Sequence, residues 1–159
     1  MASVRKAKKS DRLSLLRIIR NSGVFNKEEK DVAVELVDAA LKSKPADKDY
    51  KILAAEEACG TVEGYICYGP TPMTEGTWDV YWIVVSPWRR GTGLGKGLLR
   101  GAEAAIRALG GKRIIIDTST QASYLPARAL YASCGYRAVA TVPNYYKAGW
   151  HRVTCYKKL

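Results

Sequence analysis

A glycine-rich segment between an expected strand and an expected helix is the part of this sequence best suited to chemistry. It reads Val84-Val85-Ser86-Pro87-Trp88-Arg89-Arg90-Gly91-Thr92-Gly93-Leu94-Gly95-Lys96-Gly97-Leu98-Leu99. Glycine has no Cβ, so Gly91, Gly93 and Gly95 allow the main chain to approach a ligand closely. Backbone N–H groups at a helix start, with the positive end of the helix dipole, favour an anion such as a pyrophosphate. A tight strand-to-helix turn without a ligand is the alternative.

Two familiar phosphate-binding loops do not fit this segment. A P-loop has Ser or Thr after its lysine, whereas Lys96 is followed by Gly97, so the hydroxyl that would hold magnesium is missing. A dinucleotide-binding loop has the spacing G-x-G-x-x-G, whereas the glycines here recur at every second position. We therefore expect neither of these nucleotide sites.

Two motifs together carry a family resemblance. Read as Arg90-x-x-Gly93-x-Gly95, the segment resembles the [QR]-x-x-G-x-[GA] signature of the GNAT superfamily of acyl-CoA-dependent N-acyltransferases. The run Ala127-Arg128-Ala129-Leu130-Tyr131-Ala132-Ser133-Cys134-Gly135-Tyr136 resembles the helix and strand that follow in that family. The resemblance covers most of the chain, with one departure: Tyr124 stands where the family usually has Asn.

The resemblance implies acetyl-CoA as the acyl donor, with no metal. It places the pyrophosphate of coenzyme A on the backbone amides that open the helix, with an arginine beside it. The pantetheine arm would lie between two diverging strands, and a backbone N–H near the end of the first strand would polarise the thioester carbonyl. The residues expected to bind the donor are Val84, Val85, Arg90, Gly91, Thr92, Gly93, Leu94, Gly95 and Lys96.

Two side chains are predicted to act in catalysis. Tyr131 stands at the tyrosine position of the family, where its phenol would give a proton to the departing thiolate. A general base is less well defined, because a carboxylate, an ordered water or both could accept the proton of the attacking ammonium. Asp79 is our first candidate for the base, and Asp117 and Glu75 are the alternatives.

The acceptor is expected to be a primary amine of a small molecule, an amino acid or a peptide. It would attack acetyl-CoA directly in a ternary complex, without a covalent enzyme intermediate. Tyr81, Asp117, Tyr145 and Tyr146 are the predicted acceptor-binding residues, the last two in an expected loop at 143–149. The alternative function is a module of the same fold that binds acyl-CoA, or RNA, without turnover.

The elements that position these residues follow from hydrophobic periodicity. Helices are predicted after Asp11, with Leu13, Leu16 and Ile19 on the inner face, and at 27–42, 94–109 and 123–135, and a polar break at 44–47. Strands are predicted at 4–6, 50–57, 61–68, 78–85, 112–117, 136–142 and 150–156. The order indicates an α/β (α+β) chain, a single domain over residues 1–159, with a mixed sheet covered by helices on both faces. The resemblance implies the GNAT fold, with a mostly antiparallel sheet of six to seven strands, about four helices and splayed central strands.

Composition limits the remaining choices. The 159 residues include 26 Lys and Arg and 15 Asp and Glu, and 26 − 15 gives a net charge of +11. This surplus favours an anionic partner such as coenzyme A, although a basic solvated surface explains it equally well. No apolar run reaches the roughly 20 residues of a membrane span. Four cysteines without a C-x-x-C pair fit a reduced, cytoplasmic compartment. Nucleic acid is not the expected partner, and a homodimer through the C-terminal strands is frequent in the family that the chain resembles.

Overall fold

The computed structural model describes residues 2–42 and 50–159, and the polar break predicted at 44–47 lies outside them. Within the described residues the strands are β1 (Ser3–Lys6), β2 (Lys51–Glu56), β3 (Val62–Pro70), β4 (Thr77–Val85), β5 (Arg113–Ser119), β6 (Arg137–Lys147) and β7 (Trp150–Lys158). The α-helices are α1 (Arg12–Arg20), α2 (Lys27–Lys42), α3 (Leu94–Ala108) and α4 (Leu125–Ser133). Short 3-10 turns, η1 (Lys9–Asp11), η2 (Pro87–Arg89) and η3 (Ala122–Tyr124), precede α1, α3 and α4.

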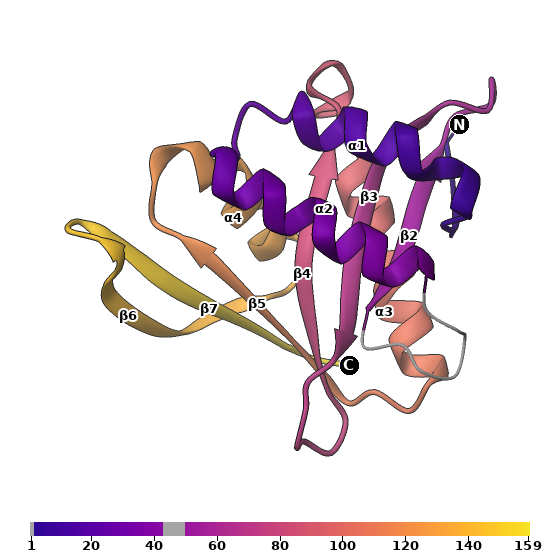
Figure 1. Ribbon diagram of the computed structural model, residues 1–159. Coiled ribbons are helices and arrows are strands. Elements are labelled where there is room, and N and C mark those ends of the chain that lie inside the picture. The colour runs from indigo at the N-terminus through magenta and orange to yellow at the C-terminus, as the bar shows by residue number, and fades with distance from the viewer. Residues whose placement is uncertain (1, 43–49) are drawn as a thin grey trace.

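All seven strands form one sheet in the order β1-β2-β3-β4-β5-β7-β6. Only β4 and β5 run parallel, and every other neighbouring pair is antiparallel. Helices α1 and α2 cover one face of the sheet and α3 lies on the other (Figure 1). The core is divided accordingly, with α1 and α2 in one buried cluster and α3 and α4 in the other. This arrangement confirms the predicted fold class.

The two central strands separate halfway along their length. β4 pairs with β5 only from Thr77 to Val80, although both strands continue beyond that point. A β-bulge interrupts the β3–β4 register at the same place, so that Tyr81 is the extra residue of β4. A bulge bends its strand and increases its twist, while β5 stays bonded to β7 along its whole length. The result is a V between β4 and β5, which Figure 1 shows opening away from the hairpin that precedes β4.

Helical periodicity predicted two helix ranges well and the inner face of the first helix only in part. The range 27–42 is confirmed for α2, and the helix predicted at 94–109 is α3, which ends at Ala108. In α1 the buried residues are Leu15, Ile18 and Ile19, so Ile19 is confirmed, whereas Leu13 is 77% exposed. The predicted face differs from the observed one by part of a turn, because a nine-residue helix holds too few apolar positions to fix its phase.

β6 is longer than the sequence indicated. The expected loop at 143–149 continues as strand to Lys147, and only two residues separate β6 from β7. Pro143 lies inside β6, which is tolerated because β6 is an edge strand with one free side. The hairpin extends away from the rest of the sheet (Figure 1), and every residue of β6 is exposed. No helix among the described residues is long and apolar enough to cross a membrane.

A buried ion pair attaches the last strand to α3. The Glu103 carboxylate, 4% exposed, accepts hydrogen bonds from Lys157 Nζ at 2.9 Å and from the Tyr136 hydroxyl at 3.1 Å. Lys157 also donates to the carbonyl of Cys134, just after α4, at 2.8 Å. Because both charges are largely out of water, loss of one partner would leave the other poorly solvated. This cluster thus fixes α4 and β7 relative to α3.

Replacement of Glu103 by Ala should destabilise the fold by about 3–5 kcal/mol, because it leaves the buried ammonium of Lys157 without a carboxylate partner. Urea unfolding followed by circular dichroism measures the loss. The matched control is Glu35→Ala on the exposed side of α2, which should change stability by less than about 0.5 kcal/mol. Equal free energies of unfolding for the two variants would contradict the structural role of Glu103.

Candidate active site

A cavity of about 1090 Å³ occupies the V between β4 and β5. This volume lies slightly above the usual range for small-ligand sites, roughly 300–1,000 Å³. Its walls come from the α1–α2 connection, the second half of β4, the start of α3, the end of β5, α4 and the β6–β7 hairpin. The unpaired stretches of β4 and β5 therefore open into a cavity large enough for a ligand.

The glycine-rich turn forms one end of this cavity. Gly91 and Gly93 have φ values of 75° and 85°, which only glycine adopts without strain. Gly93 is the N-cap of α3 and provides no side-chain oxygen for the first amides of the helix. Within the part of the chain that the structure describes, no backbone N–H from Gly91 to Lys96 donates to a protein acceptor. These free donors at the positive end of α3 form an anion cradle.

The buried carboxylate of Glu63 holds the start of the glycine-rich turn in place. Glu63 of β3 accepts hydrogen bonds from the Ser86 hydroxyl at 2.5 Å and from the Trp88 indole at 3.1 Å. Arg17 of α1 lies 3.5 Å from the same carboxylate and stacks over the Trp88 ring at 5.8 Å. Contacts with β3 and α1 thus hold Ser86 and Trp88, which precede the first glycine of the turn. No local pattern in the sequence predicts this network, because its members are far apart in the chain.

Basic side chains surround the cradle. Arg89, Arg90 and Lys96 all line the cavity. Arg89 forms a 2.6 Å ion pair with Glu57, and Arg90 donates to the carbonyl of Ser22 at the end of α1. Of these three side chains, Lys96 alone has no carboxylate or carbonyl partner among the described residues. Of the predicted donor-binding residues, Thr92 is the one outside the lining, since its hydroxyl donates back to the Arg89 carbonyl at 2.7 Å.

The β4 edge provides further backbone groups to the cavity. Ser86 N donates to the Glu63 carbonyl oxygen at 2.8 Å. Alternate residues of an antiparallel strand bond to the same neighbour, so the observed register directs the main chain of Val84 to β3. The N–H and C=O groups of Val85 and Ile83 then point to the opposite edge, where β5 has already diverged. Both predicted valines line the cavity, but Val85 rather than Val84 presents its amide to it.

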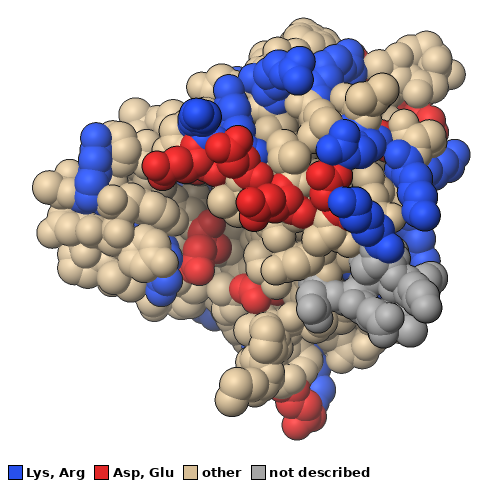
Figure 2. All heavy atoms as spheres, viewed as in Figure 1, with Lys and Arg blue, Asp and Glu red and all other residues tan. Residues whose placement is uncertain are grey.

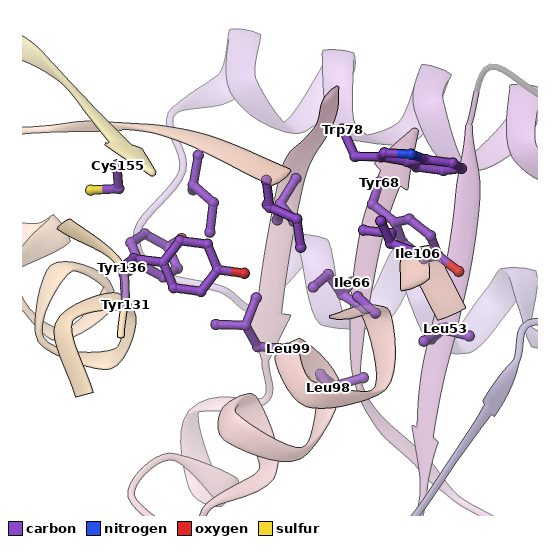
Figure 3. Packing of buried hydrophobic residues seen from close by; sticks show 14 of the residues in the cluster. Leu53, Ile66, Tyr68, Trp78, Leu98, Leu99, Ile106, Tyr131, Tyr136 and Cys155 are labelled. Carbon is purple, nitrogen blue, oxygen red and sulfur yellow. The ribbon is translucent and has the colours of Figure 1, made fainter. Parts of the chain in front are cut away.

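Tyr131 of α4 lies deep in the cavity wall. Its side chain is 6% exposed, and its ring packs near that of Tyr136 with centroids 6.3 Å apart. Figure 3 shows the two tyrosines together next to Leu99 and Cys155. No other described residue forms a hydrogen bond with the Tyr131 phenol. Burial raises the pKa of Tyr131, with a smaller contribution from Cys155, so the phenol keeps its proton in neutral and mildly basic solution.

Three of the four predicted acceptor-binding residues come together at the other end of the cavity. Tyr81, Asp117 and Tyr146 line it, although they belong to β4, β5 and β6. Tyr145 does not line the cavity: its ring packs on Tyr146 at 4.9 Å and under the guanidinium of Arg152 at 4.6 Å. Adjacent residues of a strand point to opposite faces, which explains why only one of the two tyrosines reaches the site.

Asp79, the first candidate for the base, lies outside the cavity lining. It belongs to the part of β4 that is still paired with β5, opposite Ile115, and it accepts a hydrogen bond from Thr71 at 2.6 Å. Glu75 is also outside the lining and forms a 2.5 Å ion pair with Lys112. Of the three carboxylates proposed from the sequence, the structure brings only Asp117 to the cavity.

Glu29 and Tyr124 line the cavity, and neither was assigned a role from the sequence. Glu29 forms a reciprocal capping box with Asn26 at the start of α2, with both hydrogen bonds at 2.8 Å. Its other carboxylate oxygen accepts a hydrogen bond from the Tyr124 hydroxyl at 2.8 Å, across 95 positions of sequence. The Asn26-x-x-Glu29 spacing could have indicated the capping box, but no local pattern could have indicated the contact with Tyr124.

Among the described residues, no group of three or more His, Cys, Asp or Glu side chains could hold a metal ion. All four cysteines are free thiols, and two of them, Cys67 and Cys155, are buried. The chemical groups that the cavity offers are therefore backbone amides, a buried phenol, carboxylates and basic side chains.

Comparison with known proteins identifies this arrangement. The profile of the acetyltransferase (GNAT) family matches residues 14–136, which include both motifs and most of the cavity lining. The chain therefore belongs to the GNAT family of acetyltransferases, whose acyl donor is acetyl-CoA. A search of curated proteins finds no match.

Solved structures agree with this assignment. A GNAT-family acetyltransferase from Desulfovibrio desulfuricans is 37% identical, with 99% of each chain covered and a TM-score of 0.92. An aminoglycoside 6'-N-acetyltransferase in complex with coenzyme A is 15% identical, with 98% and 96% covered and a TM-score of 0.78. The ribosomal-protein-S18-alanine N-acetyltransferase from Escherichia coli is 18% identical, with 99% and 94% covered and a TM-score of 0.76. The last two share the fold, and their acceptors differ.

A substitution in the cradle should separate ligand contact from backbone strain. Gly93→Ala and Gly110→Ala both place a Cβ at a positive φ, 85° and 81°, with no protein atom within 4 Å. Both should lose about 1–2 kcal/mol of stability. Only Gly93→Ala should weaken coenzyme A binding, by about tenfold or more, because its Cβ enters the space beside the free amides. Calorimetric titration with coenzyme A measures this, and equal affinities would refute the cradle.

Proposed function

We infer that this acetyltransferase transfers the acetyl group of acetyl-CoA to a primary amine by direct attack in a ternary complex. One observation carries the proposal: a single cavity contains the anion cradle, the open edge of β4 and a buried protonated phenol. These groups match, in order, the diphosphate, the thioester and the leaving thiolate of the donor. Solved structures of the same fold with different named acceptors leave the choice of amine to this chain's own side chains.

The donor is positioned mainly by the main chain. The free amides from Gly91 to Lys96 hold the diphosphate, and the pantetheine amides pair with the exposed edge groups of Ile83 and Val85. The thioester carbonyl then points towards the Val85 N–H, which stabilises the oxyanion that forms on attack. Because these donors are fixed by the sheet and by α3, they need no reorganisation during the reaction.

The chemical step moves one acyl group and two protons. The neutral amine attacks the thioester carbon, the C–N bond forms and the C–S bond breaks, and the sulfur takes a proton from the Tyr131 phenol. The acetylated nitrogen gives up one proton to water in the open cavity, and Tyr131 regains its own proton from the same solvent. We assign this base role to water rather than to Asp79, because Asp79 is held by Thr71 away from the lining.

Thiol release from acetyl-CoA, measured against a panel of small amines, amino acids and peptides, tests the proposed function. We expect release of one thiol per acetylated amine with at least one class of acceptor. Coenzyme A binding without thiol release from any acceptor would instead support a binding module of the same fold. Steeply salt-dependent binding of RNA would support a nucleic-acid function. A homodimer through the C-terminal strands stays a prediction, and the exposed edge of β6 leaves room for it.

Replacement of Tyr131 by Phe should lower kcat by about 10²-fold or more while coenzyme A affinity stays within twofold, because only the proton donor is lost. Since burial raises the pKa of Tyr131, the wild-type rate should show no loss from phenol ionisation up to about pH 10. Tyr136→Phe is the matched control, as that hydroxyl bonds to Glu103 instead of facing the cavity. Wild-type turnover of Tyr131→Phe would remove the acid role.

A further inference from the structure

Most charged residues of the cavity are separated by sign. Arg89, Arg90 and Lys96 lie at the cradle, the carboxylates of the lining are Glu28, Glu29 and Asp117, and Lys147 of the β6–β7 hairpin is the exception. Figure 2 shows acidic side chains along α2 and further acidic atoms in the hollow beside it, on a protein whose net charge is +11. An acidic end of the cavity in a basic protein does not follow from composition, and it lies away from the anionic donor's cradle.

Hydrogen bonds hold the two opposing carboxylates in place. Glu29 is fixed by its capping box and by the Tyr124 hydroxyl. Asp117 Oδ1 accepts a hydrogen bond from Thr154 at 2.6 Å, and its side chain is 43% exposed. Each carboxylate therefore has a defined orientation and retains acceptor capacity towards the cavity, because one carboxylate can accept about four hydrogen bonds.

Three tyrosines line the same cavity as the two carboxylates: Tyr124, Tyr131 and Tyr146. The Tyr124 hydroxyl donates to Glu29, and the buried Tyr131 phenol has no hydrogen-bond partner among the described residues. Burial first, and then the charge of Asp117 with a smaller contribution from Glu29, raises the pKa of Tyr146, which is consistent with both carboxylates facing that ring. The acidic end and the reacting end belong to one continuous wall.

Two cations lie near the acidic end. The Lys147 ammonium lies 3.4 Å from the centroid of the Trp150 ring, in a cation–π contact on the hairpin. Arg152 forms a 3.9 Å ion pair with Asp117, and its guanidinium stacks over Tyr145. Among the described residues no lysine or arginine pairs with Glu29, so a ligand cation can pair with Glu29 and share Asp117 with Arg152.

We propose that the acceptor is a small amine with a second cationic group, a diamine or polyamine, whose distal ammonium binds between Glu29 and Asp117. This inference rests on the proposed function and names its substrate class. The reacting amine must be neutral when it attacks, whereas nearby carboxylates stabilise the charged form of an amine. The carboxylates therefore suit the distal group, and the faces of Tyr124 and Tyr146 add cation–π attraction for it.

Two acceptors of equal length test the proposal. Diaminobutane and aminobutanol differ only in whether the distal group is charged. Calorimetric titration into the protein–coenzyme A complex should show diaminobutane binding about tenfold tighter at low salt. The difference should shrink as salt rises, because exposed charges are screened. Equal binding of the two compounds would overturn the proposal, and so would a preference for aminobutanol.

Substitutions of the two carboxylates test whether they cause the preference for diaminobutane. Asp117→Asn and Glu29→Gln should each reduce the preference for diaminobutane over aminobutanol severalfold, and the double variant should abolish it. Glu35→Gln, an equal loss of charge on the exposed side of α2 and outside the lining, should retain the wild-type preference. If Glu35→Gln reduces the preference as much as Asp117→Asn, a general surface field explains it and the specific site is refuted.

Turnover separates this inference from the proposed function. The ratio of kcat/KM for diaminobutane to that for aminobutanol should follow the binding preference in every variant. Thiol release with both acceptors at equal kcat/KM would refute the diamine site while leaving the acetyltransferase intact. If no amine releases thiol, the proposed function fails, and the binding preference still decides whether the acidic end recognises a second cation. Acetylation of peptide N-termini alone would also overturn the proposal.

Discussion

The divergence of β4 from β5 is the constraint on which the rest of the site depends. Two parallel strands that stayed paired would satisfy each other's backbone groups and leave no cavity. The bulge at Tyr81 bends β4 at the position where its pairing with β5 ends, and β5 stays paired with β7 along its whole length. The backbone donors and acceptors released in this way are the groups that a pantetheine arm can pair with, so the site is built from missing sheet bonds.

The two ends of the cavity offer different groups to the ligands that we propose. The cradle offers main-chain amides, which require glycines and a supported turn but few specific side chains. The proposed acceptor end offers side chains from α2, β5 and β6, which can change without disturbing the sheet. This division explains how one fold can keep a common donor while its acceptors differ. It also explains why the local charge of the acceptor end can oppose the net charge of the protein.

Sequence reasoning agrees best with the structure where the pattern consists of consecutive residues. The glycine spacing predicted the turn that opens α3, and eight of nine predicted donor-binding residues line the cavity, although their role in binding stays a prediction. It failed where geometry depends on register or on the phase of a short element. Leu13 was placed on the wrong face of α1, Asp79 was placed in a site that its strand position excludes, and Tyr145 was grouped with its neighbour Tyr146.

The sequence by itself determined the glycine-rich turn before α3 and the helices that carry a full apolar face, because their information lies within a few turns of chain. Tertiary structure alone decided the acidic end of the cavity. Glu29 and Tyr124 are 95 residues apart, and Asp117 joins them only because β5 leaves β4 and turns towards α2. Contacts of this kind depend on where strands separate, and no local pattern of side chains encodes that point.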